Sequence, residues 1–192
     1  MNEQEIEKLK SDPQFQANLK ALEEEIQKSP SIAKYYQLLD VYLALQEDEE
    51  KINELFQKIL DASFDAISNK LANKEKFDLS NIDELGAARG MYEYAIERFS
   101  QNDVKGAQEI FLALSHTIDD FEISNAMMLH AAAIAKGYTF DDFFNKLAKI
   151  DNIDFSNPKA VFVTEFAQPV DILLEMMKDE VKKLKERLSK LK

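Results

Sequence analysis

Histidine is the side chain best suited to acid–base or metal chemistry near neutral pH, and this chain has only two, His116 and His130. Neither has a carboxylate three residues before it, so the Glu-x-x-His pattern of a di-iron helical bundle is absent. His130 is surrounded by Met and Ala, which is typical of a core position. His116 falls near an expected helix end, where a cation suits the helix dipole. Neither histidine is therefore assigned a catalytic or metal-binding role.

The other residue types that carry chemistry are equally uninformative. The pairs Asp119-Asp120 and Asp141-Asp142 do not fit the alternating loop of an EF-hand, and their positions favour helix capping. The glycines form neither a dinucleotide fingerprint nor a phosphate loop. The absence of cysteine excludes disulfides, thiolate metal sites and cysteine nucleophiles. We expect a non-enzymatic protein without a catalytic residue, cofactor or metal; an enzyme on a helical bundle, with convergent carboxylates, is the third choice.

Composition indicates the fold class and the kind of partner. The 192 residues are 45% apolar and 31% charged, with only four Gly and four Pro, which favours an all-α fold. The net charge is −12, which disfavours nucleic acid as a partner. Residues 178–192 carry seven Lys or Arg and three Asp or Glu, so an acidic body precedes a basic end.

The first ten residues, MNEQEIEKLK, are acidic and polar and have no apolar core of the kind a secretory signal needs. No apolar run approaches the roughly 18 residues of a membrane span. The sequence therefore predicts a cytoplasmic protein without stable membrane insertion.

The chain is expected to form one helical domain in three segments. Residues 1–30 form an N-terminal helical arm, interrupted at Asp12-Pro13, for which docking and mobility are both open. Residues 31–168 form a body of helical hairpins with an internal boundary near 73–80. Within it, 160–166 (AVFVTEF) fits a short helix or a strand. Residues 169–192 form an amphipathic helix.

The clearest hairpin lies at residues 86–119, where two apolar stripes are separated by the polar break Ser100-Gln101-Asn102-Asp103. Small residues that would let the two helices cross closely, and the aromatic and leucine beyond them, are Ala95, Ala107, Phe111 and Leu114. This spacing resembles the tetratricopeptide repeat. The departures from the repeat are Met91, Arg98, Asn102 and Asp119. A bland antiparallel helix pair is the alternative interpretation.

The resemblance implies antiparallel helical hairpins stacked into an α-solenoid, whose concave face holds a protein or peptide partner. In that register, the residues projecting into the groove are Arg89, Tyr92, Ile96 and Phe99. Core packing is an equal alternative for Ile96 and Phe99. The favoured function is a protein-binding scaffold, chaperone or adaptor.

The chain also resembles the tetratricopeptide class of type III secretion chaperones. The likeness rests on AQEIFLAL at 107–114, the acidic turn and helix that follow, and the Met- and Lys-containing LLEMMKDEVKKLK near the end. It implies a secreted or membrane-bound client protein.

The last segment carries apolar residues at a spacing of four and three, which is typical of a coiled-coil seam. These residues are Val170, Leu174, Met177, Val181, Leu184 and Leu188. A self-associating structural protein that dimerises through this seam is therefore the second functional interpretation. A long helix that caps the helical stack explains the same spacing.

Overall fold

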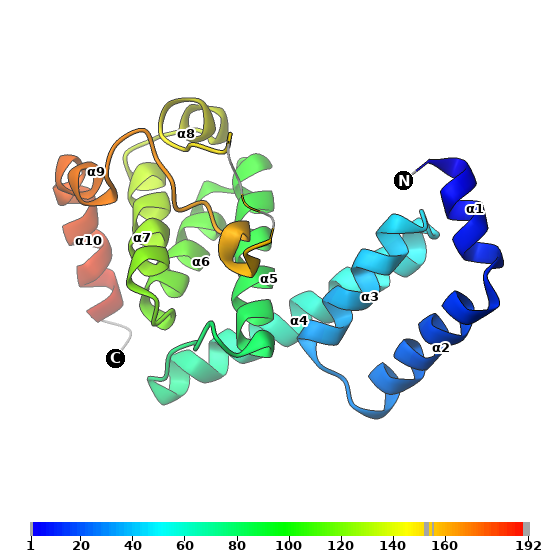
Figure 1. The fold of residues 1–192 in the computed structure, drawn as a ribbon. Helices are drawn as coiled ribbons and strands as arrows, with labels where there is room; N and C mark the ends of the chain where they lie inside the picture. The colour runs from blue at the N-terminus through cyan, green and yellow to red at the C-terminus, as the bar shows by residue number, and fades with distance from the viewer. Residues whose placement is uncertain (1, 152–153, 155, 190–192) are drawn as a thin grey trace. The chain divides into compact units, whose positions relative to one another are not determined.

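The structure, a computed structural model, describes residues 2–151, 154 and 156–189. These residues form ten α-helices and one short 3-10 helix and contain no β-strand, which confirms the all-α fold (Figure 1). None of the described helices combines the length and apolar character needed to cross a membrane. The chain divides into two compact units, residues 1–64 and 65–192. Solenoid stacking of the tetratricopeptide kind stays a prediction.

Unit 1 begins with three helices whose ends are fixed by local side chains. They are α1 (Glu3–Ser11), α2 (Pro13–Lys28) and α3 (Ile32–Ala44), and the unit also includes the first part of α4 (Glu49–Asn73). Asp12 caps α2, whose first residue is Pro13, so the predicted break between α1 and α2 is confirmed. Ser31 accepts a hydrogen bond from the backbone N–H of Lys34 and caps α3.

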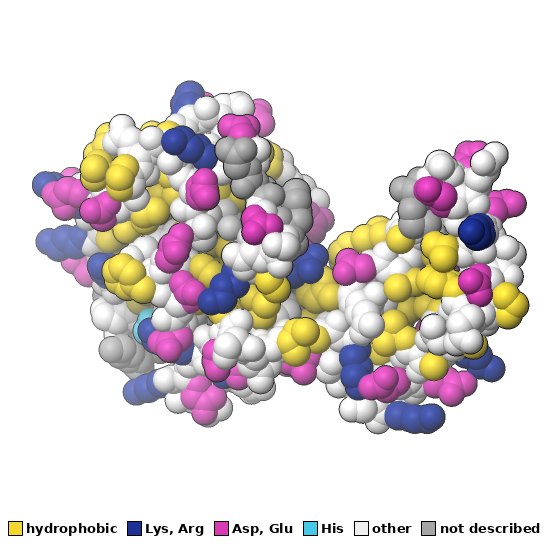
Figure 2. Space-filling view, viewed as in Figure 1, with side chains coloured by type: hydrophobic (Ala, Val, Ile, Leu, Met, Phe, Trp, Pro, Cys, Tyr) yellow, Lys and Arg dark blue, Asp and Glu magenta, His cyan; other side chains and the backbone are white. Residues whose placement is uncertain are grey.

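The N-terminal arm docks within unit 1, because α1 packs on α2 and α2 packs on α3. Apolar side chains from α2, α3 and α4 form its core: Ile26, Tyr36, Leu38, Leu39, Leu55 and Ile59. Hydrophobic side chains also remain visible on the surface over α2 and α3 (Figure 2). Residues 1–30 are thus part of a unit that extends to Phe64, rather than a separate segment.

The boundary between the units falls inside α4, not in the polar stretch near 73–80. That stretch ends α4, but its later part belongs to unit 2. Phe77 is fully buried there, and its backbone N–H donates to the carbonyl of Thr117 at 2.6 Å. The buried aromatic side chain explains why this polar loop is not a linker.

Unit 2 contains the remaining helices: α5 (Ile82–Ser100), α6 (Val104–Thr117), α7 (Phe121–Ala135), α8 (Phe140–Lys146), η1 (Pro158–Val161), α9 (Val170–Met176) and α10 (Lys178–Ser189). The α6 helix packs against both α5 and α7. The hairpin residues at the predicted α5–α6 crossing are all fully buried: Ala95, Ala107, Phe111 and Leu114. The central hairpin is therefore confirmed as a closely packed helix pair.

The C-terminal segment differs from the single long helix that the heptad spacing predicts. Met177 adopts a non-helical conformation (φ −113°, ψ 25°) and separates α9 from α10. Both helices pack against α7, and α10 also contacts α6. The Met177 side chain at this break is buried in the core of unit 2. Residues 190–192 of the predicted segment lie outside the described residues.

Candidate protein-binding groove

The predicted groove on α5 is not open. Tyr92 and Phe99 are only 3% and 2% exposed, and Arg89 and Ile96 are half-buried. The prediction that Tyr92 and Phe99 line an accessible face is therefore wrong, whereas core packing, the alternative for Phe99, is confirmed.

Segments that follow α7 in the sequence cover this face. The ring of Phe162 lies 5.3 Å from that of Tyr92, and the backbone N–H of Val163 donates to the Tyr92 hydroxyl at 3.1 Å. Phe99 packs against Phe140 and Phe143 of α8. The sequence left residues 160–166 undecided between helix and strand. They contain the end of η1 followed by an irregular run, which includes Phe162 and Val163.

The buried histidine beneath this cover has a structural role. His130 Nδ1 lies 2.7 Å from the carbonyl oxygen of Ala126, and Nε2 lies 3.4 Å from the Tyr92 hydroxyl. Burial lowers the pKa of His130 to about 4, so the ring is neutral at pH 7. Nδ1–H then donates to Ala126 and Nε2 accepts from Tyr92, whose own pKa burial raises. Both ring nitrogens of His130 and the Tyr92 hydroxyl therefore have hydrogen-bond partners, and the assignment of His130 to the core is confirmed.

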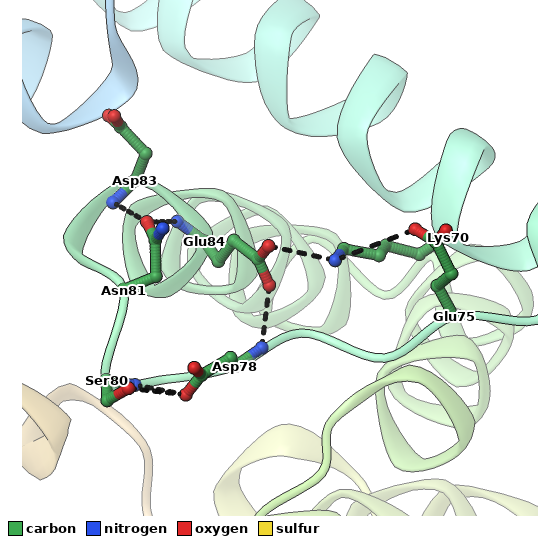
Figure 3. Close-up of polar contacts among 7 residues, drawn as sticks. All are labelled: Lys70, Glu75, Asp78, Ser80, Asn81, Asp83 and Glu84. Atoms are coloured by element: carbon green, nitrogen blue, oxygen red, sulfur yellow. Dashed lines mark hydrogen bonds and ion pairs between the residues drawn. The ribbon is translucent and has the colours of Figure 1, made fainter.

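A second polar cluster holds the loop between α4 and α5 (Figure 3). Lys70 Nζ lies 2.9 Å from one oxygen of Glu84, and the other oxygen accepts the backbone N–H of Asp78 at 2.6 Å. Ser80 donates its hydroxyl to Asp78, while Asn81 caps α5. Lys70 neutralises Glu84, Ser80 holds the Asp78 carboxylate, and these contacts fix the loop.

Acidic clusters do not offer a metal site either. Among the residues that the structure describes, no three His, Asp or Glu side chains converge closely enough to hold an ion. A cavity of about 210 Å³ is lined by Asp120 and Lys159, among others, and these two form an ion pair at 2.9 Å.

A groove in unit 2 lies between α7, α9 and α10, with a volume of about 790 Å³. Its apolar lining comes from Met128 of α7, Leu174 of α9 and Val181 of α10. We call this the α7–α9–α10 groove. Figure 2 shows hydrophobic side chains among charged ones over the region of α9 and α10.

The two rims of the groove differ chemically. The rim formed by α6 and α7 carries Ser115, Ser124 and Asn125. The opposite rim carries three lysines of α10 at a spacing of four and three, which places them on one side of the helix: Lys178, Lys182 and Lys185. Lys178 pairs with Glu175 at 3.1 Å, whereas Lys182 and Lys185 form no ion pair with any described residue.

The predicted association seam divides between this groove and the core. Leu174 and Val181 line the groove and are half-buried, whereas Met177 and Leu184 are each 2% exposed and pack inside unit 2. The remaining seam residues, Val170 and Leu188, are also half-buried. The six residues therefore do not form one continuous exposed stripe.

The α7 wall, including Met128, is not predictable from the sequence, because Met128 and Val181 are brought to one groove only by tertiary packing. The lysine rim had a local signal, since three lysines at positions i, i+4 and i+7 of one helix share a side.

Comparison with known proteins adds no relative, since no protein-family model, curated protein or solved structure matches this chain. Membership of the tetratricopeptide repeat family thus stays a prediction.

Proposed function

We propose that the protein is a non-enzymatic scaffold or adaptor that holds a segment of a partner protein in the α7–α9–α10 groove. The observation that carries this proposal is the apolar lining of Met128, Leu174 and Val181 between two polar rims. An apolar centre within a polar rim is the usual anatomy of a protein interface.

The wall contributed by α7 supports this function because it is preorganised. The side chains of this helix from Ala126 to Ile134 are all buried, so the helix is held in place before a partner arrives. A rigid wall lowers the entropy lost on binding. The client class implied by the secretion-chaperone resemblance, a secreted or membrane-bound protein, remains a prediction.

Self-association is the second candidate, and one observation favours it. Leu174 and Val181, two of the residues in the predicted seam, line the groove, so a second copy of the chain would cover them. Sedimentation of the purified chain at several concentrations distinguishes a dimer from a monomer that binds another protein.

Site-specific photo-crosslinking in the cells that make the protein tests the proposed function. A photoreactive amino acid at position 182 sits on the groove rim, whereas one at 183 lies next to it but outside the groove lining. We expect one dominant protein adduct from position 182, which is lost when Val181→Glu places a charge in the apolar lining. Equal adducts from both positions, or none from 182, would contradict a partner in this groove.

A further inference from the structure

We propose that the occupant of the α7–α9–α10 groove is an amphipathic α-helix whose flank facing α10 carries carboxylates. This inference rests on the proposed function and adds the secondary structure and charge of the partner segment.

The elements around the groove favour a helix over an extended peptide. The walls are α-helices, which use their backbone N–H and C=O groups internally and present no strand edge for an added strand. The groove lining contains no aromatic side chain of the kind that receives a polyproline helix. An α-helical partner satisfies its own backbone and needs only an apolar stripe to bind.

The hydroxyl groups on the rims lead to the same conclusion. Ser115 donates to the carbonyl of Leu112, Ser124 to that of Phe121 and Ser189 to that of Glu186, at 2.7, 3.1 and 2.8 Å. These hydroxyl donors are therefore already hydrogen-bonded to carbonyl oxygens of their own helices. An extended segment would therefore find few groups for its backbone carbonyls, and burying these unpaired is costly.

The charges along α10 set the chemistry of the facing flank. Lys182 and Lys185 have no ion-pair partner among the described residues, while Glu186 is the one carboxylate that α10 adds to the lining. The lining as a whole is balanced, since Asp171, Glu175 and Glu186 offset its three lysines. On the α10 rim itself the positive charge exceeds the negative, and with Lys178 paired to Glu175 the unpaired cations are Lys182 and Lys185. Carboxylates on the facing side of a partner helix complement that rim, and such complementarity selects partners and their orientation.

Two designed peptides of about 18 residues, long enough to form a helix, test this inference against the full-length chain. Both carry Leu at positions i, i+3, i+4 and i+7 and a fluorescein label. The first has Glu on one flank, and the second has Lys at the same positions. By fluorescence anisotropy, we expect the Glu peptide to bind at least about tenfold more tightly than the Lys peptide, with the difference shrinking as salt is raised.

Matched variants locate the effect on the rim. Lys182→Glu reverses one charge in the groove, and Lys183→Glu makes the same change one residue away, outside the lining. We expect Lys182→Glu to weaken binding of the Glu peptide by about tenfold and to strengthen binding of the Lys peptide. Lys183→Glu should change either binding affinity by less than about twofold. Circular dichroism checks that both variants keep their helix content.

The possible outcomes distinguish failure of the acidic helical partner from failure of the proposed protein-binding function. Equal binding of both peptides, abolished by Val181→Glu, would overturn the acidic flank and leave a protein-binding groove. Undiminished binding of a Glu peptide with a central proline would overturn the helical occupant. Failure of both peptides to bind would overturn this inference alone if position 182 still yields its protein adduct. A dimer that Val181→Glu dissociates would identify a second copy as the occupant and overturn the partner helix.

Discussion

The central helix of unit 2 and the first two helices of unit 1 are buried to very different extents. In unit 2, α7 has ten buried residues out of fifteen, whereas in unit 1 α1 and α2 each bury a single side chain, Ile6 and Ile26. Hydrophobic stabilisation scales with the apolar area removed from water. Unit 2 is therefore expected to be the stable part of the chain, and the first helices of unit 1 are expected to open more readily.

Half-buried side chains around the unit 1 core explain why its first helices bury less apolar surface than the central helix of unit 2. The side chains packed around the unit 1 core stay partly exposed: Leu19, Leu22, Ile32, Tyr35, Tyr42 and Ile52. In unit 2, large side chains such as Phe111, Phe143 and Met127 are fully enclosed. A surface groove built on unit 2 thus rests on a rigid core.

Removing one large side chain from each unit gives the largest expected contrast. Phe111→Ala leaves a cavity in a fully enclosed site and should lower the free energy of unfolding by about 3–5 kcal/mol. Ile26→Ala in the unit 1 core, where the side chain is still 9% exposed, should cost about 2 kcal/mol. Urea denaturation followed by circular dichroism gives the sizes, and hydrogen exchange assigns each loss to its unit. A larger cost for Ile26→Ala would reverse the comparison.

Local signals predicted the helices and their ends. The predicted Asp12-Pro13 break depends on neighbouring residues alone. The structure shows the same local origin for the Ser31 cap of α3 and for the left-handed Gly137 after α7 (φ 93°). The α5–α6 crossing was also predictable because Ala95 and Ala107 mark a close approach between adjacent helices.

Contacts distant in sequence could not be predicted. Tyr92 is buried by a segment 71 residues away, which donates the Val163 N–H, and nothing near Tyr92 indicates that cover. The break at Met177, whose side chain is buried in the core, has no Gly or Pro beside it to indicate it in the sequence. The predicted seam included Leu174 and Val181, which line the groove. The opposite wall of the groove, on α7, can be identified only from the tertiary structure.

Acid should destabilise unit 2 more than unit 1, because the buried His130 lies in unit 2. The pKa of His130 is about 4 in the folded protein, below the ordinary 6.5 of an unfolded chain. Above pH 6.5 the ring is neutral in both states. As the pH falls from 6.5 to 4, the unfolded chain binds a proton that the folded chain does not, and unit 2 loses about 3 kcal/mol.

Urea denaturation at several pH values between 7 and 4 measures this loss. His130→Phe should flatten the dependence over that window, while the control His116→Gln, at an exposed position, should retain it. The lowered pKa values of Asp103 and Asp120 take effect only below their ordinary value of 3.8, outside this window. An unchanged pH dependence in His130→Phe would show that another group causes the acid sensitivity.

Two tyrosine hydroxyls give the smallest contrast, since each substitution removes one oxygen atom. Tyr92→Phe leaves the Val163 N–H and the fully buried Nε2 of His130 without their partner, which should cost about 1–3 kcal/mol. Tyr42→Phe in unit 1 removes a 2.7 Å hydrogen bond to Glu23, but both groups are half-buried and water can replace the hydroxyl. That change should cost about 0.5–1 kcal/mol. Urea denaturation of both variants measures the difference, and equal costs would show that the enclosure of unit 2 adds nothing to the strength of its polar contacts.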